Sequence, residues 1–145
     1  MKFTIRKFKE DDRSEVMEMM RVFYASDAVS TNGSEEIFRA DFDACIGDSP
    51  YLEGFAVECE DGIVGYTMIA KSFSTEFGKP CTWIEDIYVK DAYRGMGLGN
   101  MLMKVITESY TDCIFRLEAE EENERAIRLY EKFGFTDLPY KEMKK

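Results

Sequence analysis

Residues 94–100 combine residue types that suit the binding of an anion. The segment is Arg-Gly-Met-Gly-Leu-Gly-Asn, so three glycines alternate with larger residues between a predicted strand and a predicted helix. Glycine lets a backbone approach a ligand closely and adopt dihedral angles that other residues avoid. The first N–H groups of a helix have no partner inside the helix, and the helix dipole makes that end positive. With the guanidinium of Arg94, these groups would form a cradle for a phosphate group.

Two familiar phosphate-binding loops do not fit this segment. A Walker loop needs Lys and then Ser or Thr after its last glycine, and here Asn100 and Met101 follow Gly99. The dinucleotide fingerprint needs a third glycine where this chain has Asn100 or Leu102. A glycine-rich connection selected for close packing is the alternative. The strand, the arginine, the alternating glycines and the amphipathic helix together favour the cradle.

Two adjacent carboxylates, Glu85 and Asp86, lie inside the predicted strand 82–89. Neighbouring residues of a strand point to opposite faces, so only one of them can face a cleft unless a bulge intervenes. A lone carboxylate is costly to bury. The pair therefore indicates either a catalytic or substrate-binding site, or a sheet-edge or ion-paired structural position.

Tyr130 and an acidic run complete the candidates for chemistry. Tyr130 shares a predicted helix face with Ala126 and Phe133, a spacing typical of a core aromatic, and its hydroxyl is also a candidate proton donor. The run 118–124 carries five glutamates. A solvated patch near a helix N-terminus is the favoured interpretation of the run, and a collar that attracts cations is the alternative.

Composition limits the class of protein. The chain has 145 residues, of which 45% are hydrophobic and 33% charged, with a net charge of −10, which suits one soluble domain, 1–145. It has no histidine and no Cys-x-x-Cys pair, which excludes zinc fingers and Ser-His-Asp triads, and we expect no metal site. The negative charge disfavours nucleic acid and anionic membranes as partners. No apolar signal core follows Met1, so we expect a cytoplasmic protein with reduced cysteines.

The hydrophobic pattern predicts an alternation of strands and helices. Strands are expected at 2–8, 54–60, 63–73, 82–89 and 113–119, with one or two more within 135–143. Helices are expected from Asp11 or Asp12 through 24, and at 34–46, 97–110 and 123–133. The Asp61-Gly62 turn predicts an antiparallel hairpin, and the helix between 82–89 and 113–119 predicts that these two strands are parallel. The fold class is α/β (α+β), a mixed sheet with helices on both faces.

Several segments resemble one known family. Arg94-x-x-Gly97-x-Gly99 resembles the Arg/Gln-x-x-Gly-x-Gly/Ala signature of the GNAT superfamily of acetyl-CoA-dependent N-acetyltransferases. Residues 83–95 are similar to the cofactor strand and turn of that family, and 123–135 to its second motif. Within the superfamily, Glu85-Asp86 and the flanking residues look like the diamine (spermidine/spermine) acetyltransferases.

The resemblance implies a fold and a reaction. The fold would be a mostly antiparallel sheet in which the parallel strands 82–89 and 113–119 splay apart to admit the cofactor. The reaction would be acetyl transfer from acetyl-CoA to a primary amine by direct attack in a ternary complex, without a metal. A small cationic, polyamine-like acceptor is the leading expectation. The alternatives are a protein N-terminal or lysine acetyltransferase and a non-catalytic acyl-CoA-binding regulatory module. Homodimers are common in the family.

The resemblance also implies roles for individual residues. Glu85 would be the base, Tyr130 the general acid, and Asp86 would bind the amine or hold a relay water. Ile87 and Val89 would pair with the pantetheine arm, and the Ile87 or Tyr88 N–H would face the thioester oxygen. Asn123 would contact the arm. The pyrophosphate would be held by Arg94, Gly95, Met96, Gly97, Leu98, Gly99 and Asn100.

Overall fold

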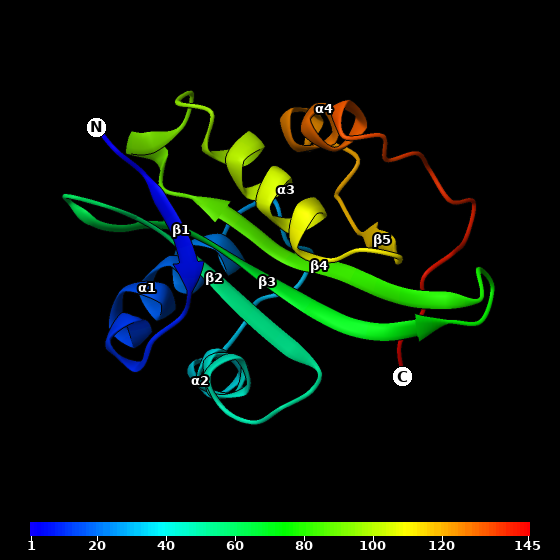
Figure 1. The fold of residues 1–145 in the computed structure, drawn as a ribbon, viewed down its shortest axis with the longest axis horizontal. Coiled ribbons are helices and arrows are strands. Elements are labelled where there is room, and N and C mark those ends of the chain that lie inside the picture. Colours follow the sequence, from blue (N-terminus) through cyan, green and yellow to red (C-terminus); the bar gives the residue numbers. More distant parts are fainter.

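The computed structural model describes residues 1–145 and contains one five-stranded sheet with helices on both faces (Figure 1). The strands follow the chain in the order β1 (Thr4–Lys7), β2 (Leu52–Cys59), β3 (Gly62–Ser74), β4 (Lys79–Val89) and β5 (Ile114–Leu117). The helices are α1 (Arg13–Tyr24), α2 (Glu35–Ile46), α3 (Leu98–Ser109) and α4 (Glu124–Lys132), with short 3₁₀ turns at Glu10–Asp12 and Asp91–Tyr93.

The pairing of the strands confirms the predicted fold class. β1 to β4 pair antiparallel with their neighbours, and β4 and β5 pair parallel across the α3 crossover. The β2–β3 hairpin turns at the predicted place, where Gly62 has φ +108°. The sheet is therefore mixed and mostly antiparallel.

Alternating side chains of the sheet form two cores. In β2, Ala56 packs with α1 and α2 on one face, whereas Phe55 and Val57 pack with α3 and α4 on the other. This alternation follows from the period of two in a strand. Val16 and Phe42 are fully buried on the α1/α2 side, as the helical spacing requires.

The ends of the elements follow local chemistry. The Ser34 side chain accepts a hydrogen bond from the Ile37 N–H and begins α2, and Asn123 accepts one from the Ala126 N–H and begins α4. The spacing of apolar residues in α3 predicts a core face with Leu98, Met101, Leu102, Val105 and Ile106. Met101 does not fit this prediction, because it is 37% exposed and Met103 is fully buried instead.

The predicted strands within 135–143 are also wrong, because this tail has no regular structure. Residues 136–145 are all exposed, so the tail offers no face that a sheet could bury. Pro139 has no N–H to donate to a strand partner. The tail is attached by a side chain instead, since the Tyr140 hydroxyl donates to Glu76 in the turn between β3 and β4.

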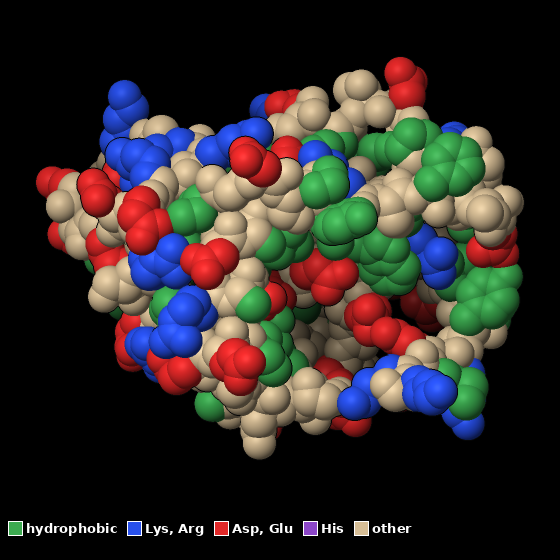
Figure 2. All heavy atoms as spheres, turned by 90° about the horizontal axis from the view of Figure 1, so that it is seen from below, with side chains coloured by type: hydrophobic (Ala, Val, Ile, Leu, Met, Phe, Trp, Pro, Cys, Tyr) green, Lys and Arg blue, Asp and Glu red, His purple; other side chains and the backbone are tan.

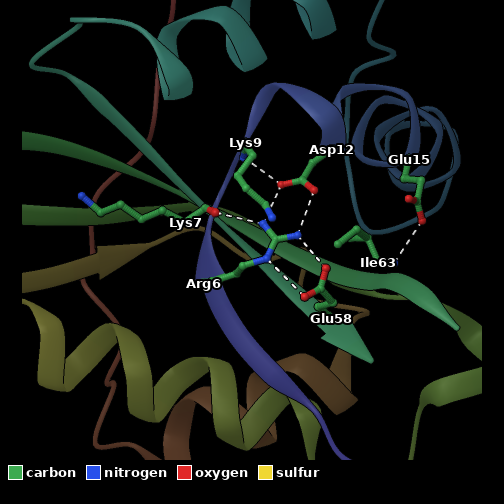
Figure 3. A network of polar contacts seen from close by, with 7 residues as sticks. All are labelled: Arg6, Lys7, Lys9, Asp12, Glu15, Glu58 and Ile63. Carbon is green, nitrogen blue, oxygen red and sulfur yellow. Dashed lines mark hydrogen bonds and ion pairs between the residues drawn. The ribbon is translucent and has the colours of Figure 1, made fainter. Parts of the chain in front are cut away.

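An ion-pair network ties β1 to β2 and to the start of α1 (Figure 3). The Arg6 guanidinium donates to both carboxylate oxygens of Asp12 at 2.8 and 3.0 Å, and to Glu58 Oε2 at 2.8 Å. The Lys9 N–H donates to Asp12 Oδ2 at 2.8 Å. Burial would raise the pKa of Asp12, but the hydrogen bonds from Arg6 and Lys9 hold it below its usual value.

None of the helices combines the length and the apolar character that a bilayer crossing requires.

Candidate active site

A cleft begins where β4 and β5 separate. β5 pairs with β4 only from Cys81 to Ile84, and the rest of β4, residues 85–89, has no partner on that side. β5 is short because the acidic segment after Leu117 leaves the sheet. The cleft has a volume of about 1340 Å³ and is lined by β4, the start of α3, α4, the segment between α1 and α2, and the C-terminal tail.

The glycine segment forms an open cradle at one end of this cleft. Gly95 and Gly97 have φ +80° and +81°, values that favour glycine, and a Cβ on either would meet no atom within 4 Å. The first helical hydrogen bond runs from the Met101 N–H to the Gly97 carbonyl at 3.0 Å. The N–H groups of residues 98–100 therefore have no partner in the helix and are available to an anion.

Gly99 and Arg94 have additional structural roles. A Cβ on Gly99 would lie 3.0 Å from Leu129 of α4, so this glycine serves the close packing that was the alternative explanation of the motif. The Arg94 Nε donates to the Val89 carbonyl at 2.9 Å, and its guanidinium pairs with Asp91 at 2.6 Å. Arg94 thus fixes the turn after β4 and also lines the cleft.

The backbones of Ile87 and Val89 face the unpaired edge of β4. The Lys90 N–H donates to the Val64 carbonyl of β3, and hydrogen bonding alternates along a strand. Tyr88 therefore faces β3 with its backbone, and Ile87 and Val89 face the cleft. An extended ligand in the cleft could pair with these two residues as an added strand.

A β-bulge brings the two neighbouring acids to the same cleft. Asp86 pairs with Met68 and Ile84 with Ile69, so Glu85 is the extra residue in β4. Both Glu85 and Asp86 line the cleft, but Glu85 is exposed and Asp86 is only 3% exposed. The sequence left open whether one or both acids face the cleft. Both do, because the bulge interrupts the strict alternation of faces at this point.

Two tyrosines hold the buried carboxylate. The Tyr24 hydroxyl donates to Asp86 Oδ1 at 2.7 Å, and the Tyr66 hydroxyl donates to Asp86 Oδ2 at 2.9 Å. Burial raises the pKa of Asp86, while these hydrogen bonds oppose the rise. Partial burial and the charges of Asp86 and Glu142 raise the pKa of Glu85.

Tyr130 reaches the cleft from α4 with a free hydroxyl. The residue is 9% exposed and lines the cleft, and its ring packs 6.2 Å from that of Phe135. The Tyr130 hydroxyl bonds to no protein group. Because every fully buried polar side-chain atom in the structure has a hydrogen-bond partner, this hydroxyl is not fully buried and must reach the open cleft. Burial raises its pKa to about 12, which keeps the proton on the hydroxyl. Asn123 lines the cleft close by and uses its side-chain oxygen to cap α4.

The two ends of the cleft differ in charge. Arg94, Arg125 and Arg128 line it together with the cradle, whereas acidic side chains line the other end: Glu85, Asp86, Glu118 and Glu142. Figure 2 shows acidic side chains around the hollow in the face opposite α3 and α4. None of these four carboxylates has a Lys or Arg within ion-pair distance. Much of the acidic run, residues 118 and 120–122, lines the cleft, although a solvated patch was the favoured interpretation.

Sequence reasoning missed four residues of this acidic end. Tyr24 lies at the end of the first predicted helix and Tyr66 in the predicted strand 63–73, and nothing local indicates that their hydroxyls meet Asp86. Asp41 of α2 is half-buried without a partner, and burial and the charges of Asp86 and Glu85 raise its pKa to about 6. Glu142 lies on the tail that was expected to form strands.

A five-stranded mixed sheet that splays over a glycine cradle defines a protein of the acetyltransferase class. The model of the Acetyltransferase (GNAT) family matches residues 15–135. This match covers more than half of the chain, so the chain belongs to the GNAT family and is an acyltransferase that moves an acetyl group to an amine.

Individual relatives agree with this assignment. The chain is 33% identical over 147 residues to the thialysine N-epsilon-acetyltransferase of Sus scrofa, covering 92% of this chain and 84% of that one. It is 23% identical over 141 residues to the spermine/spermidine N(1)-acetyltransferase of Bacillus subtilis (strain 168), covering 93% and 88%. The crystal structure of a possible acetyltransferase from Clostridium difficile 630 superposes with a TM-score of 0.80 and 21% identity, covering 99% and 96% of the two chains, which shows the shared fold.

Proposed function

We propose that this chain takes the acetyl group from acetyl-CoA and transfers it to a primary amine of a small cationic acceptor. One observation carries the proposal: a single cleft joins a cradle of free N–H groups and arginines to a group of carboxylates that lack cationic partners. The two named relatives support a small acceptor, since thialysine and spermidine are both small cationic amines.

The cradle end is suited to the donor. When bound, acetyl-CoA supplies the thioester that the amine attacks. The free N–H groups from residues 95–100 would hold its pyrophosphate, with Arg94 beside them. The Ile87 and Val89 backbone would hold the pantetheine arm along the open edge of β4, close to the Asn123 side chain. The Ile87 N–H is the proposed hydrogen-bond donor to the thioester oxygen, since Tyr88 directs its own N–H to β3.

The acidic end is suited to the amine. An alkylamine with a pKa near 10.4 is almost fully protonated at neutral pH, so it must lose a proton before it can attack. Glu85 is exposed in the cleft, and its raised pKa makes it a better proton acceptor than an ordinary glutamate. Asp86 would attract the ammonium group or hold a water that relays the proton to Glu85.

Tyr130 is suited to the leaving group. Its hydroxyl is protonated at neutral pH, has no protein partner and lies in the cleft. It would donate its proton to the departing thiolate and recover one from water after the product leaves.

A panel of acceptors tests the proposal. Thiol release from acetyl-CoA should be fastest with spermidine or thialysine, slower with a neutral amine, and slowest with peptides that present an N-terminus or a lysine. A preference for the peptides would favour the protein-directed alternative. Binding of acetyl-CoA without turnover on any amine would favour the regulatory module.

The domain organisation, the cellular location and the oligomeric state are part of the same proposal. We propose one catalytic domain over 1–145, a cytoplasmic location and a homodimer as in many relatives of this family. Sedimentation equilibrium tests the dimer, and a single melting transition that acetyl-CoA shifts as a whole tests the single domain.

A further inference from the structure

Asp86 lies between the sheet and α1, where two tyrosine hydroxyls from different elements bind it. The Tyr24 hydroxyl at the end of α1 donates to Oδ1 at 2.7 Å, and the Tyr66 hydroxyl of β3 donates to Oδ2 at 2.9 Å. Figure 1 shows α1 on the face of the sheet opposite to α3 and α4. The carboxylate is therefore held by both of its oxygens on the α1 side of the β4 bulge.

The two tyrosines differ in their access to the cleft. Tyr66 is fully buried and does not line the cleft, whereas Tyr24 is partly exposed and lines it together with Asp86. The sheet thus holds one carboxylate oxygen from within the core, and α1 holds the other at the wall of the cleft. Burial and the charge of Asp86 raise the pKa of both tyrosines, so each hydroxyl keeps its proton and donates it.

No other side chain near Asp86 favours its ionised form. Glu85 of β4 and Asp41 of α2 are acidic, and Cys45 of α2 is a neutral thiol because burial and nearby carboxylates raise its pKa to about 12. No Lys or Arg forms an ion pair with Asp86, in contrast to Asp12 near β1. Because burial favours the neutral acid, the two hydroxyls are the donors that oppose protonation.

The charge of Asp86 decides what this part of the cleft can bind. An ionised Asp86 beside Glu85 attracts an ammonium group, whereas a protonated Asp86 has no charge to offer. Replacing a buried polar group and its partners by apolar side chains of similar shape is often neutral or stabilising. The network is therefore better explained by the charge that it keeps in the cleft than by the stability of the fold.

We propose that Tyr24 and Tyr66 are positioning residues, which act through Asp86 by keeping its carboxylate ionised and fixed at the wall of the cleft. An acceptor ammonium group then meets a charged Asp86 even in mildly acidic solution. The inference rests on the proposed function and deepens it, since it names the groups that keep the acidic end able to bind a cation. No bond is made or broken at either tyrosine.

An NMR titration measures this effect without any turnover. In protein labelled with [¹³Cγ]aspartate, the Asp86 signal is the one that Asp86→Asn removes, and its chemical shift against pH gives the pKa. Tyr24→Phe and Tyr66→Phe each remove one donor, so the pKa of Asp86 should rise by about one pH unit, as expected for a lost hydrogen bond to a charged group. Tyr110→Phe is the matched control, because its hydroxyl donates to Glu53 outside the cleft and should leave the pKa of Asp86 unchanged.

The dependence of kcat/KM on pH shows whether the tyrosines act on the reaction. A raised pKa keeps Asp86 neutral up to a higher pH, so the acidic limb of the spermidine profile should move up by about one pH unit in both tyrosine variants and not in Tyr110→Phe. The deficit should be about tenfold on this limb and should shrink as pH rises.

Two results would overturn the inference. The first is an unchanged pKa of Asp86 in either folded tyrosine variant. The second is a raised pKa with an unmoved kcat/KM profile, because the hydrogen bonds would then have only a structural role. Tyr24 is partly exposed, so Tyr24→Phe decides the test by itself if Tyr66→Phe does not fold.

Adding the acceptor separates this inference from the proposed function. With coenzyme A bound, spermidine should lower the pKa of Asp86 in the wild type, because a nearby ammonium group favours the ionised form. If spermidine lowers this pKa but no amine is acetylated, the inference stands and the proposed function fails. If spermidine is acetylated without any effect on the pKa of Asp86, the inference fails and acetyl transfer stands.

Discussion

The same residue types form opposite environments at the two ends of the sheet. Near β1, Asp12 is buried with Arg6 as its partner, and the pKa of the carboxyl is lowered (Figure 3). In the cleft, Asp86, Glu85 and Glu118 have no cationic partner, and the pKa of each is raised. Folding alone does not select uncompensated carboxylates, because burying an unpaired charge is unfavourable. The contrast is consistent with a first group that stabilises the fold and with the proposal that the second binds a cationic acceptor.

The largest expected effect concerns the cradle at the other end of the cleft. Gly97→Val places a β-branched side chain at φ +81°, in the space where the pyrophosphate would lie. Because this removes one anion-binding site, acetyl-CoA affinity should fall by more than about a hundredfold. Calorimetric titration measures the affinity. Gly78→Val is the matched control, because Gly78 has φ +65° in the distant β3–β4 turn. Equal affinities in the two variants would contradict the cradle.

Loss of the proton donor should have the second-largest effect. Tyr130→Phe keeps the ring and removes only the hydroxyl, so kcat should fall roughly ten- to a thousandfold while the melting temperature hardly changes. Tyr110→Phe is the control, since Tyr110 packs in the same core but bonds to Glu53 outside the cleft. Full activity in Tyr130→Phe would return this tyrosine to a packing role.

The effect of the proposed base should depend on pH. Glu85→Gln should lower kcat/KM most at pH values below the acceptor's own pKa, where the amine still carries its proton, and the deficit should shrink as pH approaches about 10. A pH profile of wild type and variant measures this. A loss of the same size at every pH would instead indicate a structural or binding role.

The smallest effects concern stability, and they should have opposite signs in the two regions. Asp12→Asn should lower stability at pH 7 by about 1–3 kcal/mol, because it leaves Arg6 without its partner. The lowered pKa of Asp12 means that this contribution is present above its unfolded pKa, near 4, and is lost as pH falls through the folded value.

Asp41→Asn should raise stability above pH 6 rather than lower it. The pKa of Asp41 is raised to about 6, so the folded protein binds its proton more tightly and loses stability as pH rises from about 4 to 6. The variant should therefore melt above the wild type at pH 8 and close to it at pH 4. Thermal melts at both pH values check the two variants together, and shifts of the same sign at pH 8 would remove the proposed contrast.

Much of the fold and of the cradle end could be predicted from the sequence. The alternation in β2 and β3 and the caps Ser34 and Asn123 are local patterns, and Gly95 and Gly97 act through their own backbone. Such features need no knowledge of distant residues.

The acidic end could be predicted only in part. That Glu85 and Asp86 share one cleft depends on a bulge, which is a property of the pairing between β3 and β4. The hydroxyl of Tyr24 meets a carboxylate 62 positions away. Glu142 lines the same cleft as Glu118, and it lies on a tail that lacks the expected strands. These are long-range contacts that no local pattern specifies.

We propose that the carboxylates without cationic partners at one end of the cleft attract a cationic amine. The most direct test of this proposal is the dependence of kcat/KM on ionic strength for spermidine, pentylamine and an uncharged amine acceptor of low pKa. Salt shortens the Debye length to about 10 Å at 0.1 M, so kcat/KM should fall most steeply for spermidine, less steeply for pentylamine and hardly at all for the uncharged amine. A salt response that is the same for all three acceptors would contradict the proposal.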